Sequence, residues 1–194
     1  MAYTQKFYTA DTHFGHQLML SATACARPFS DTREMDEFLI DGWNAAVRSG
    51  DVIYHLGDFA FGLGDEARVR SVFRRLNGRK ILILGNHDYD RQNRIHRVIA
   101  GLGWEDVTQQ YETTDEGQRV FLSHYAQRTW PGQHKGAFHF YGHSHGKLPG
   151  FGRSRDVGVD CPDVGYAPAT FRQLTAAMAM VEEMVGSEAM GVCQ

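Results

Sequence analysis

The stretch ILILGNHDYD, residues 81–90, joins an apolar run directly to a cluster of polar side chains. Its four apolar residues stop at Gly85, and Asn86, His87 and Asp88 follow without a gap. The apolar run is typical of a buried strand, and each of the three polar residues can bind a metal ion or take part in proton transfer. The stretch therefore predicts either a turn or a functional site at the end of a strand.

Short apolar runs and amphipathic segments alternate along the chain. Strands are predicted near residues 7–10, 52–56, 80–84, 120–122, 138–141 and 157–159. Helices are predicted over residues 31–47 and 69–76, and a third helix is expected to begin at residue 170. The first helix has an apolar face made of Met35, Phe38, Leu39, Trp43, Ala46 and Val47. Helices follow strands in the first half and strands crowd the second, which predicts an α/β fold with helices outside mixed sheets.

Length, composition and charge restrict the class of protein. The chain has 194 residues, 42% hydrophobic and 22% charged, and we expect a single domain over residues 1–194 with a mobile tail at residues 186–194. The formal net charge of −3 argues against a protein that binds a nucleic-acid polymer. The three cysteines form no CxxC pair, and we find no signal peptide and no run of about 18 apolar residues. We therefore expect a cytoplasmic protein that does not cross a membrane, and its oligomeric state stays open.

Five predicted strands end in side chains that are able to bind metals. These polar segments are Asp11-Thr12-His13, Gly57-Asp58, Gly85 to Asp88, Ser123-His124 and Gly142-His143-Ser144-His145. Taken singly, each could be a turn, a cap or a surface histidine pair. In α/β folds, however, ligands bind at the carboxyl ends of strands, and the D-x-H and H-x-H spacings place two side chains on one side of an extended segment. Two divalent metal ions would supply the partners that such a set of polar groups needs.

The ordered set D-x-H, GD, GNHD, a lone histidine and GHSH resembles the calcineurin-like metallophosphoesterase superfamily. The stretches DTHFGH, ARPF, YHLGDF, HYAQRTW and DVGVD look like those of its small single-domain members from bacteria and phages. The resemblance implies a four-layer αββα sandwich, in which two mixed β-sheets are flanked by helices. It also implies a first metal bound by Asp11, His13, Asp58 and His145, and a second metal bound by Asp58, Asn86, His124 and His143.

The ligand chemistry favours transition metals. Imidazole mixed with carboxylate and amide oxygen suits Mn, Fe, Co, Ni or Zn better than Mg or Ca, and Mn²⁺ is the first expectation. A pair of such ions lowers the pKa of a bridging water, whose hydroxide can attack phosphorus in line. The predicted function is a metal-dependent phosphoesterase that hydrolyses a small phosphodiester or phosphomonoester, nucleotides included. Two alternatives are a DNA-processing nuclease and a non-catalytic protein-interaction scaffold of the same fold.

His87 matches the catalytic histidine of the family, and by this resemblance it would protonate the leaving oxygen. The Ser/Thr protein phosphatases resemble this chain at the metal motifs but carry a carboxylate three residues after the aspartate of the GD motif. Phe61 stands at that place here, so His87 lacks that partner. This difference argues against protein-phosphatase activity. Whether Asp88 or another group orients His87 stays open.

Residues close to these motifs are candidates for substrate contact. His16 and Arg27 could meet phosphate oxygens, although His16 could instead hydrogen-bond a neighbouring ligand and Arg27 could form a surface salt bridge. The loop between the last two histidine motifs is expected to form a rim that selects the leaving group, through Trp130, Pro131, His134 and Lys135. Three other histidines are assigned structural roles, namely His55, His96 and His139.

Overall fold

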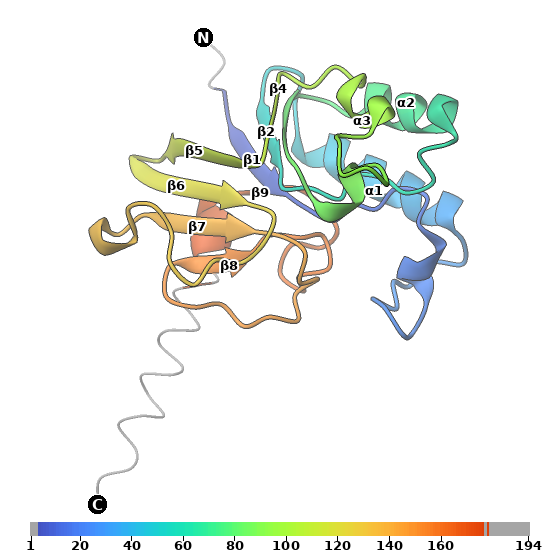
Figure 1. The fold of residues 1–194 in the computed structure, drawn as a ribbon. Coiled ribbons are helices and arrows are strands. Elements are labelled where there is room, and N and C mark those ends of the chain that lie inside the picture. The colour runs from blue at the N-terminus through green and yellow to red at the C-terminus, as the bar shows by residue number, and fades with distance from the viewer. Residues whose placement is uncertain (1–3, 177, 179–194) are drawn as a thin grey trace, which may run out of the picture.

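A computed structural model describes residues 4–176 and 178 of the protein (Figure 1). Two β-sheets lie next to one another, and α-helices lie on the outer side of the larger sheet. This arrangement confirms the predicted pair of mixed sheets flanked by helices. The tail predicted at residues 186–194 lies outside the described residues. Within residues 4–176, no helix is long and apolar enough to cross a membrane.

The larger sheet has five strands in the order β4-β3-β2-β1-β9. Its parallel strands are β1 (Lys6–Thr9), β2 (Val52–His55), β3 (Arg79–Ile83) and β4 (Asp106–Thr108). Strand β9 (Ala169–Thr170) pairs with β1 in the antiparallel direction. The parallel strands present all their carboxyl ends at one edge of the sheet, which is where four of the predicted ligand residues follow.

The smaller sheet has four strands in the order β5-β6-β7-β8. Strands β5 (Gln110–Asp115) and β6 (Gln118–Ser123) are antiparallel, and β7 (Phe138–Tyr141) and β8 (Ser154–Asp156) continue parallel to β6. The strand predicted at residues 157–159 is thus displaced, because β8 ends at Asp156 and Gly158 makes only a bridge to Ala10. Strand β5 escaped prediction because its sequence, QYETTD, contains no apolar run.

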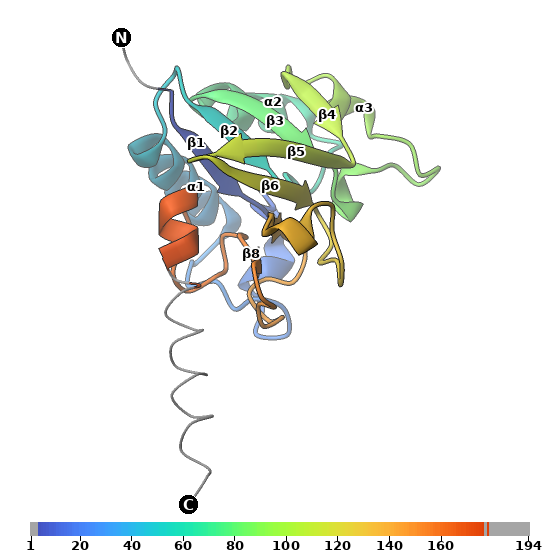
Figure 2. The same cartoon turned by 90° about the vertical axis from the view of Figure 1, so that its left-hand side faces the viewer.

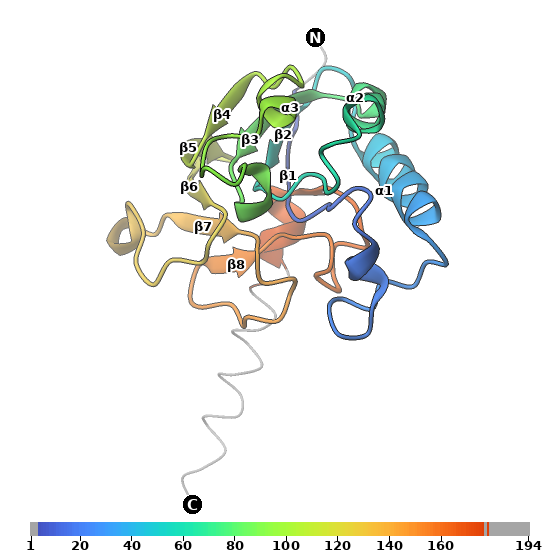
Figure 3. The same cartoon turned by 45° about the vertical axis from the view of Figure 1, so that its right-hand side comes forward.

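Three α-helices cover the outer face of the larger sheet: α1 (Thr32–Ala46), α2 (Glu66–Arg75) and α3 (Arg97–Ala100) (Figures 1 and 3). Helix α1 begins after Asp31, whose carboxylate accepts a hydrogen bond from the Glu34 amide at 2.8 Å. The third predicted helix also has its capping box, since Thr170 and Gln173 exchange hydrogen bonds and residues 171–176 are helical. Three short 3₁₀ helices complete the fold: η1 (Gln17–Leu20), η2 (Asn86–Asp88) and η3 (Gln133–Lys135).

Alternate residues of the parallel strands enter two different cores. Phe7 and Leu82 pack against the helices, whereas Tyr8 and Ile83 pack between the two sheets. Strands that are buried on both faces are expected to have continuous apolar sequences, which explains why the sequence revealed them. The apolar face of α1 is narrower than predicted, because Phe38 is 49% exposed.

The outer face of the smaller sheet is covered by the segment that precedes β7 (Figure 2). The buried Trp130 ring packs with Phe121 of β6, and its Nε1 donates to the Ala137 carbonyl oxygen at 2.8 Å. Short helix η3 lies in the same segment. In the described residues this layer is therefore thin and contains no α-helix.

The three histidines predicted to be structural hold parts of the fold together. His55 is fully buried and shares a hydrogen bond with Thr12 at 2.9 Å. His139 is fully buried between the hydroxyls of Ser123 and Ser154, at 2.9 and 2.8 Å, and burial lowers its pKa to about 4. His96 caps α3 by accepting a hydrogen bond from the Val98 amide.

We expect His139 to make the fold sensitive to acid. The pKa of His139 is about 4 in the folded chain and 6.5 in the unfolded chain. Between pH 4 and pH 6.5 the unfolded chain therefore binds a proton that the folded chain does not. The neutral His139 ring should therefore stabilise the fold fully above pH 6.5. As the pH falls toward 4, this contribution is lost, and the free energy of unfolding decreases by about 3 kcal/mol. Urea titrations of metal-free wild type and His139→Gln across this pH range measure the slope.

The matched control for this experiment is His134→Gln, which replaces an exposed histidine of η3. The control should keep the acid dependence of the wild type, whereas His139→Gln should flatten it. An acid dependence that is the same in all three proteins would contradict the assignment of His139 as a buried neutral group.

Candidate metal centre

The carboxyl ends of five strands bring the predicted ligands together. Loops that follow β1, β2 and β3 meet loops that follow β6 and β7, where the two sheets approach one another (Figures 1 and 3). The Asp11 amide donates to the Gly57 carbonyl oxygen and the Gly142 amide donates to the His124 carbonyl oxygen, both at 3.0 Å. All seven predicted ligands lie at this junction: Asp11, His13, Asp58, Asn86, His124, His143 and His145.

The backbone of this junction is strained. Five of the seven predicted ligands have φ between 48° and 66°, in the left-handed region: Asp11, His13, Asp58, His143 and His145. A residue other than glycine seldom adopts this region, and each instance costs on the order of 1–3 kcal/mol. Such strain persists only where surrounding contacts hold the chain in place, and its concentration here is typical of a functional site.

Asp88 supplies contacts that hold the strained loops. Its buried carboxylate accepts hydrogen bonds from the amides of Gly85 at 2.9 Å, Asp58 at 3.0 Å and Phe59 at 3.2 Å. Gly85 must be glycine, because a Cβ there would lie 2.6 Å from the Asp58 nitrogen. Burial raises the pKa of Asp88 to about 7. Both of its oxygens serve the backbone, so Asp88 joins two loops and does not orient the His87 ring.

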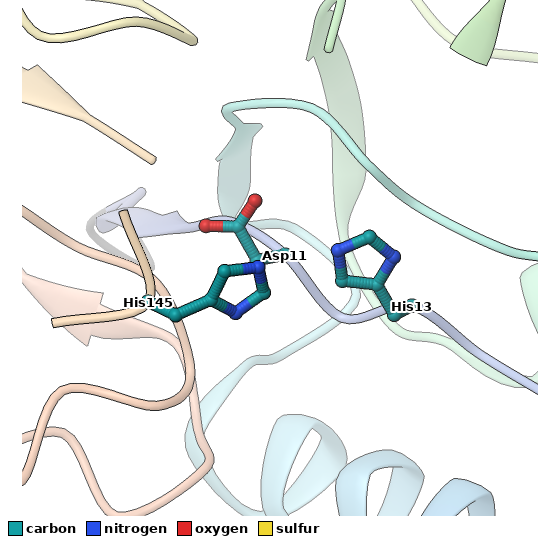
Figure 4. A group of neighbouring side chains, drawn as sticks. All are labelled: Asp11, His13 and His145. Atoms are coloured by element: carbon teal, nitrogen blue, oxygen red, sulfur yellow. The ribbon is translucent and has the colours of Figure 1, made fainter. Parts of the chain in front are cut away.

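A first ligand cluster consists of Asp11, His13 and His145, whose ligand atoms lie within 4.8 Å of one another. Figure 4 shows the Asp11 and His145 side chains turned toward each other, with the His13 ring beside them. Asp11 Oδ2 accepts a hydrogen bond from the His143 amide at 2.8 Å, but Asp11 Oδ1 and His13 Nε2 are buried without a hydrogen-bond partner. Buried polar atoms without a partner are costly, and a cation between them would remove that cost.

A second ligand cluster consists of Asp58, His124 and His143, with Asn86 among them. The His124 ring donates from Nδ1 to the Leu56 carbonyl oxygen at 2.7 Å, and burial lowers its pKa, so its Nε2 carries no proton. This bare nitrogen faces the Asn86 Oδ1 oxygen at 3.1 Å and Asp58 Oδ2 at 3.6 Å. Three acceptors that face one another fit a bound cation.

Asp58 connects the two clusters. The same oxygen that faces His124, Oδ2, lies 3.5 Å from His13 Nε2 of the first cluster. The other oxygen, Oδ1, accepts a hydrogen bond from the His87 amide at 2.8 Å. The carboxylate therefore lies where a ligand shared by two ions would have to lie.

The pKa values of the three residues of the first cluster are shifted in different directions. Burial raises the pKa of Asp11 well above its ordinary value and lowers the pKa of His13 well below it. Burial acts to lower the pKa of His145, but the hydrogen bonds to Asp160 and Cys25 and the charge of Asp11 together outweigh burial and raise that pKa to about 10. A site that takes up a metal ion must release such protons, so occupancy should depend on pH.

Asp160, which was not among the predicted site residues, orients His145. Its Oδ2 accepts from His145 Nδ1 at 2.7 Å, so a metal could bind at Nε2 of that ring once this nitrogen has released its proton. Arg27 is buried and donates to both Asp160 oxygens at 2.8 Å and to the carbonyl oxygens of Asp11 and Thr12. These bonds occupy the guanidinium, which favours a role of Arg27 in positioning the centre over the predicted phosphate contact. In the sequence, Asp160 is indicated only by the stretch DVGVD, which ends with it and resembles the small members of the family.

His87 lies beside the first cluster, with its ring centroid 5.1 Å from that of His13. The buried His16 shares a hydrogen bond with His13 at 3.4 Å, and burial lowers its pKa to about 4, so it is neutral at pH 7. Phe61 stacks on His16 with centroids 3.8 Å apart and meets the edge of His87. An aromatic ring thus stands where the protein phosphatases carry a carboxylate.

The rim predicted from Trp130, Pro131, His134 and Lys135 does not fit the structure. This segment ends immediately before β7 and so lies at the amino end of the strand, whereas the ligand clusters lie at its carboxyl end. Trp130 is buried against the smaller sheet, as described above. Proximity in sequence to two histidine motifs misled the prediction, because the chain crosses the length of the sheet between them.

Comparisons with known proteins find relatives of similar sequence. An uncharacterised protein of Methanocaldococcus jannaschii is 38% identical over 88 residues, which cover 45% of this chain and 49% of that protein. The gene 66 protein of Mycobacterium phage L5 is 31% identical over 101 residues, which cover 50% of this chain and 47% of that protein. The matched segments thus span about half the length of either relative.

The fold is also found in a solved structure. The crystal structure of a protein of unknown function from Aquifex aeolicus superposes with a TM-score of 0.65, and the match covers 90% of this chain and 100% of that chain at 21% identity. Residues 7–157, which include every predicted ligand and His87, match the calcineurin-like phosphoesterase family. The chain therefore belongs to the calcineurin-like phosphoesterase family.

Proposed function

We propose that the protein is a metal-dependent phosphoesterase that hydrolyses small phosphodiesters or phosphomonoesters. The observation that carries this proposal is the pair of ligand clusters that share Asp58, with the buried polar atoms Asp11 Oδ1 and His13 Nε2 that lack a hydrogen-bond partner beside it. Membership of the calcineurin-like phosphoesterase family supports the same class of reaction.

Two divalent ions fit the donor set. Asp11, His13, Asp58 and His145 would hold the first, and Asp58, Asn86, His124 and His143 would hold the second. When bound, the ions would lower the pKa of a water molecule and offset the charge of the phosphate. Mn²⁺ is the first candidate because imidazole, carboxylate and amide donors suit it, and Fe, Co, Ni and Zn are compatible as well.

The chain's own side chains would bind the phosphate and deliver a proton. His87 would donate the proton that the leaving oxygen takes up, since it lies beside the first cluster with its amide fixed by Asp58 Oδ1. His16 adjoins both His13 and His87 and is neutral, so it would offer a hydrogen bond to a phosphate oxygen without adding charge. Phe61 would shield this flank from water.

Metal content tests the shared ligand. Wild type that is reconstituted with Mn²⁺ and dialysed should retain about two ions per chain, as measured by elemental analysis. Asp58→Asn should lose both ions because it contributes to both clusters, whereas Asn86→Ala should lose the second ion more than the first. Asp41→Asn, which changes an exposed carboxylate of α1, is the control and should match wild type. A wild-type protein that retains one ion or none would contradict the two-metal assignment.

The leaving group tests the role of His87. A general acid contributes about 10²–10⁴-fold, and its effect is largest when the leaving oxygen is strongly basic. His87→Ala should therefore lose far more activity on an alkyl or nucleoside ester than on a nitrophenyl ester, while it keeps both metals. Steady-state rates on the two esters give this ratio. Equal losses on both esters with full metal content would mean that His87 orients the phosphate and is not the acid.

Asp160→Asn tests the positioning of His145. A group that orients a metal-binding histidine typically contributes about 10–100-fold in metal affinity, so the variant should bind the first ion more weakly by that factor. The control is Asp163→Asn, because Asp163 forms a similar two-bond pair with Arg155. Titration of metal-free protein with Mn²⁺ measures both affinities. If the two variants bind metal equally well, Asp160 has no positioning role.

A further inference from the structure

A cavity of about 430 Å³ opens beside the second ligand cluster. Asn86 and His124 form part of its wall, and the remainder comes from the segments that follow β3 and β6 and from the β4–β5 junction. Its volume lies within the range of about 300–1,000 Å³ that is typical of small-molecule sites. The cavity is therefore large enough for a substituent of the phosphate, and it begins at the second ligand cluster.

The lining of this cavity is polar but carries no formal charge. Besides the two ligands, its side chains with hydrogen-bonding groups include Asn93, Gln109, Gln110, Gln127, Tyr89 and Tyr125. None of the described residues that line it is Lys, Arg, Asp or Glu. Side-chain amides both donate and accept hydrogen bonds, and tyrosines add aromatic faces. Such a lining favours a neutral, planar group with several donors and acceptors, and it offers no cationic side chain to a second phosphate.

Tyr125 joins the cavity to the second cluster. Its ring packs against His143 with centroids 4.5 Å apart, and its hydroxyl donates to Asn86 Oδ1 at 3.3 Å. The side chain is nevertheless 52% exposed, so a face of the ring stays free for stacking. Elsewhere in the lining, Gln109 Nε2 donates to the Tyr89 hydroxyl at 3.4 Å, so the Gln109 amide oxygen can accept a hydrogen bond from a ligand.

His87 does not line the cavity, because its ring lies on the other flank with His13, His16 and Phe61. If His87 protonates the leaving oxygen, the leaving group must lie on that flank. The group that occupies the cavity is then the other substituent of a phosphodiester, which stays on phosphorus after hydrolysis. The leaving group would thus lie beside His87, and the retained substituent would lie in the polar cavity.

We propose that this cavity binds the nucleoside that remains on phosphorus, so that the substrate is a nucleoside phosphodiester. The inference rests on the phosphoesterase function proposed above. A nucleobase is planar, neutral and edged with donors and acceptors, and glutamine and asparagine recognise such edges while aromatic side chains stack on base faces. In the reaction, water adds to phosphorus, the bond to the leaving oxygen breaks, that oxygen takes up a proton, and a nucleoside monophosphate is left.

Two esters that share a leaving group can test how the enzyme recognises the group that stays on phosphorus. Thymidine 5′-(4-nitrophenyl phosphate) and methyl 4-nitrophenyl phosphate both release 4-nitrophenol and differ only in what stays on phosphorus. Gln109→Leu and Gln127→Leu keep the side-chain size but remove the amide. Each should lower the ratio of kcat/KM for the thymidine ester over the methyl ester by about 3- to 10-fold, which is the effect of one lost hydrogen bond. Gln118→Leu, at the opposite end of β6, should keep the wild-type ratio.

The outcomes separate this inference from the proposed function. If metal-loaded wild type hydrolyses both esters with equal kcat/KM, or if the Gln109 and Gln127 variants keep the wild-type ratio, the cavity does not bind a nucleoside and the phosphoesterase function stands. A glycerol ester that is preferred as strongly as the thymidine ester would also overturn base recognition. If neither ester is hydrolysed while two metals are bound, the proposed function fails.

Direct binding tests the cavity even without turnover. Calorimetric titration of the metal-loaded protein with thymidine 5′-monophosphate and with methyl phosphate compares the same phosphate with and without a nucleoside. Tighter binding of the nucleotide that weakens about 3- to 10-fold in Gln109→Leu and Gln127→Leu would support the inference. Equal affinities for the two ligands in wild type would overturn it.

Discussion

The buried carboxylate of Asp58 is the constraint around which the centre is built. One of its oxygens accepts from the His87 amide, and the other faces His13 on one side and His124 on the other. These two histidines follow strands of different sheets, so Asp58 lies where the sheets meet. Withdrawing a carboxylate from water is costly unless hydrogen bonds or a cation compensate. The strained backbone of the ligand loops and the hydrogen bonds of Asp88 hold this carboxylate in place. Gly85 contributes because it has no Cβ, which would collide with Asp58.

The sequence allowed much of this architecture to be predicted, for a physical reason. Strands such as β1 and β3 are buried on both faces, so their apolar runs are continuous and easy to recognise. The ligand residues were found because each follows such a run and because their order matches a known family. By contrast, β5 is a polar edge strand whose side chains alternate between exposed and half-buried, and no local pattern distinguishes it from a loop.

The parts that could not be predicted depend on contacts between distant segments. Arg27 and Asp160 are 133 positions apart, and nothing in ARPF indicates that its arginine is satisfied within the protein. The left-handed backbone at Asp11 and His145 is equally hidden, since glycine is the usual sign of that conformation and neither residue is glycine. Trp130 shows that closeness in sequence to histidine motifs does not imply closeness in space, because it is buried against the smaller sheet.

The long separation of the ligands along the chain bears on which metal the protein acquires. Of the seven predicted ligands, only Asp11, His13, Asp58 and Asn86 come before residue 100, and both clusters include histidines from beyond residue 120. A growing chain therefore offers incomplete donor sets, and neither cluster exists until both sheets have formed. Selectivity among divalent transition metals depends on metal availability as well as on ligand type and geometry. If the proposed ions bind, they meet a complete donor set only once folding has finished, so the metal pool at that place would influence which ion fills the centre.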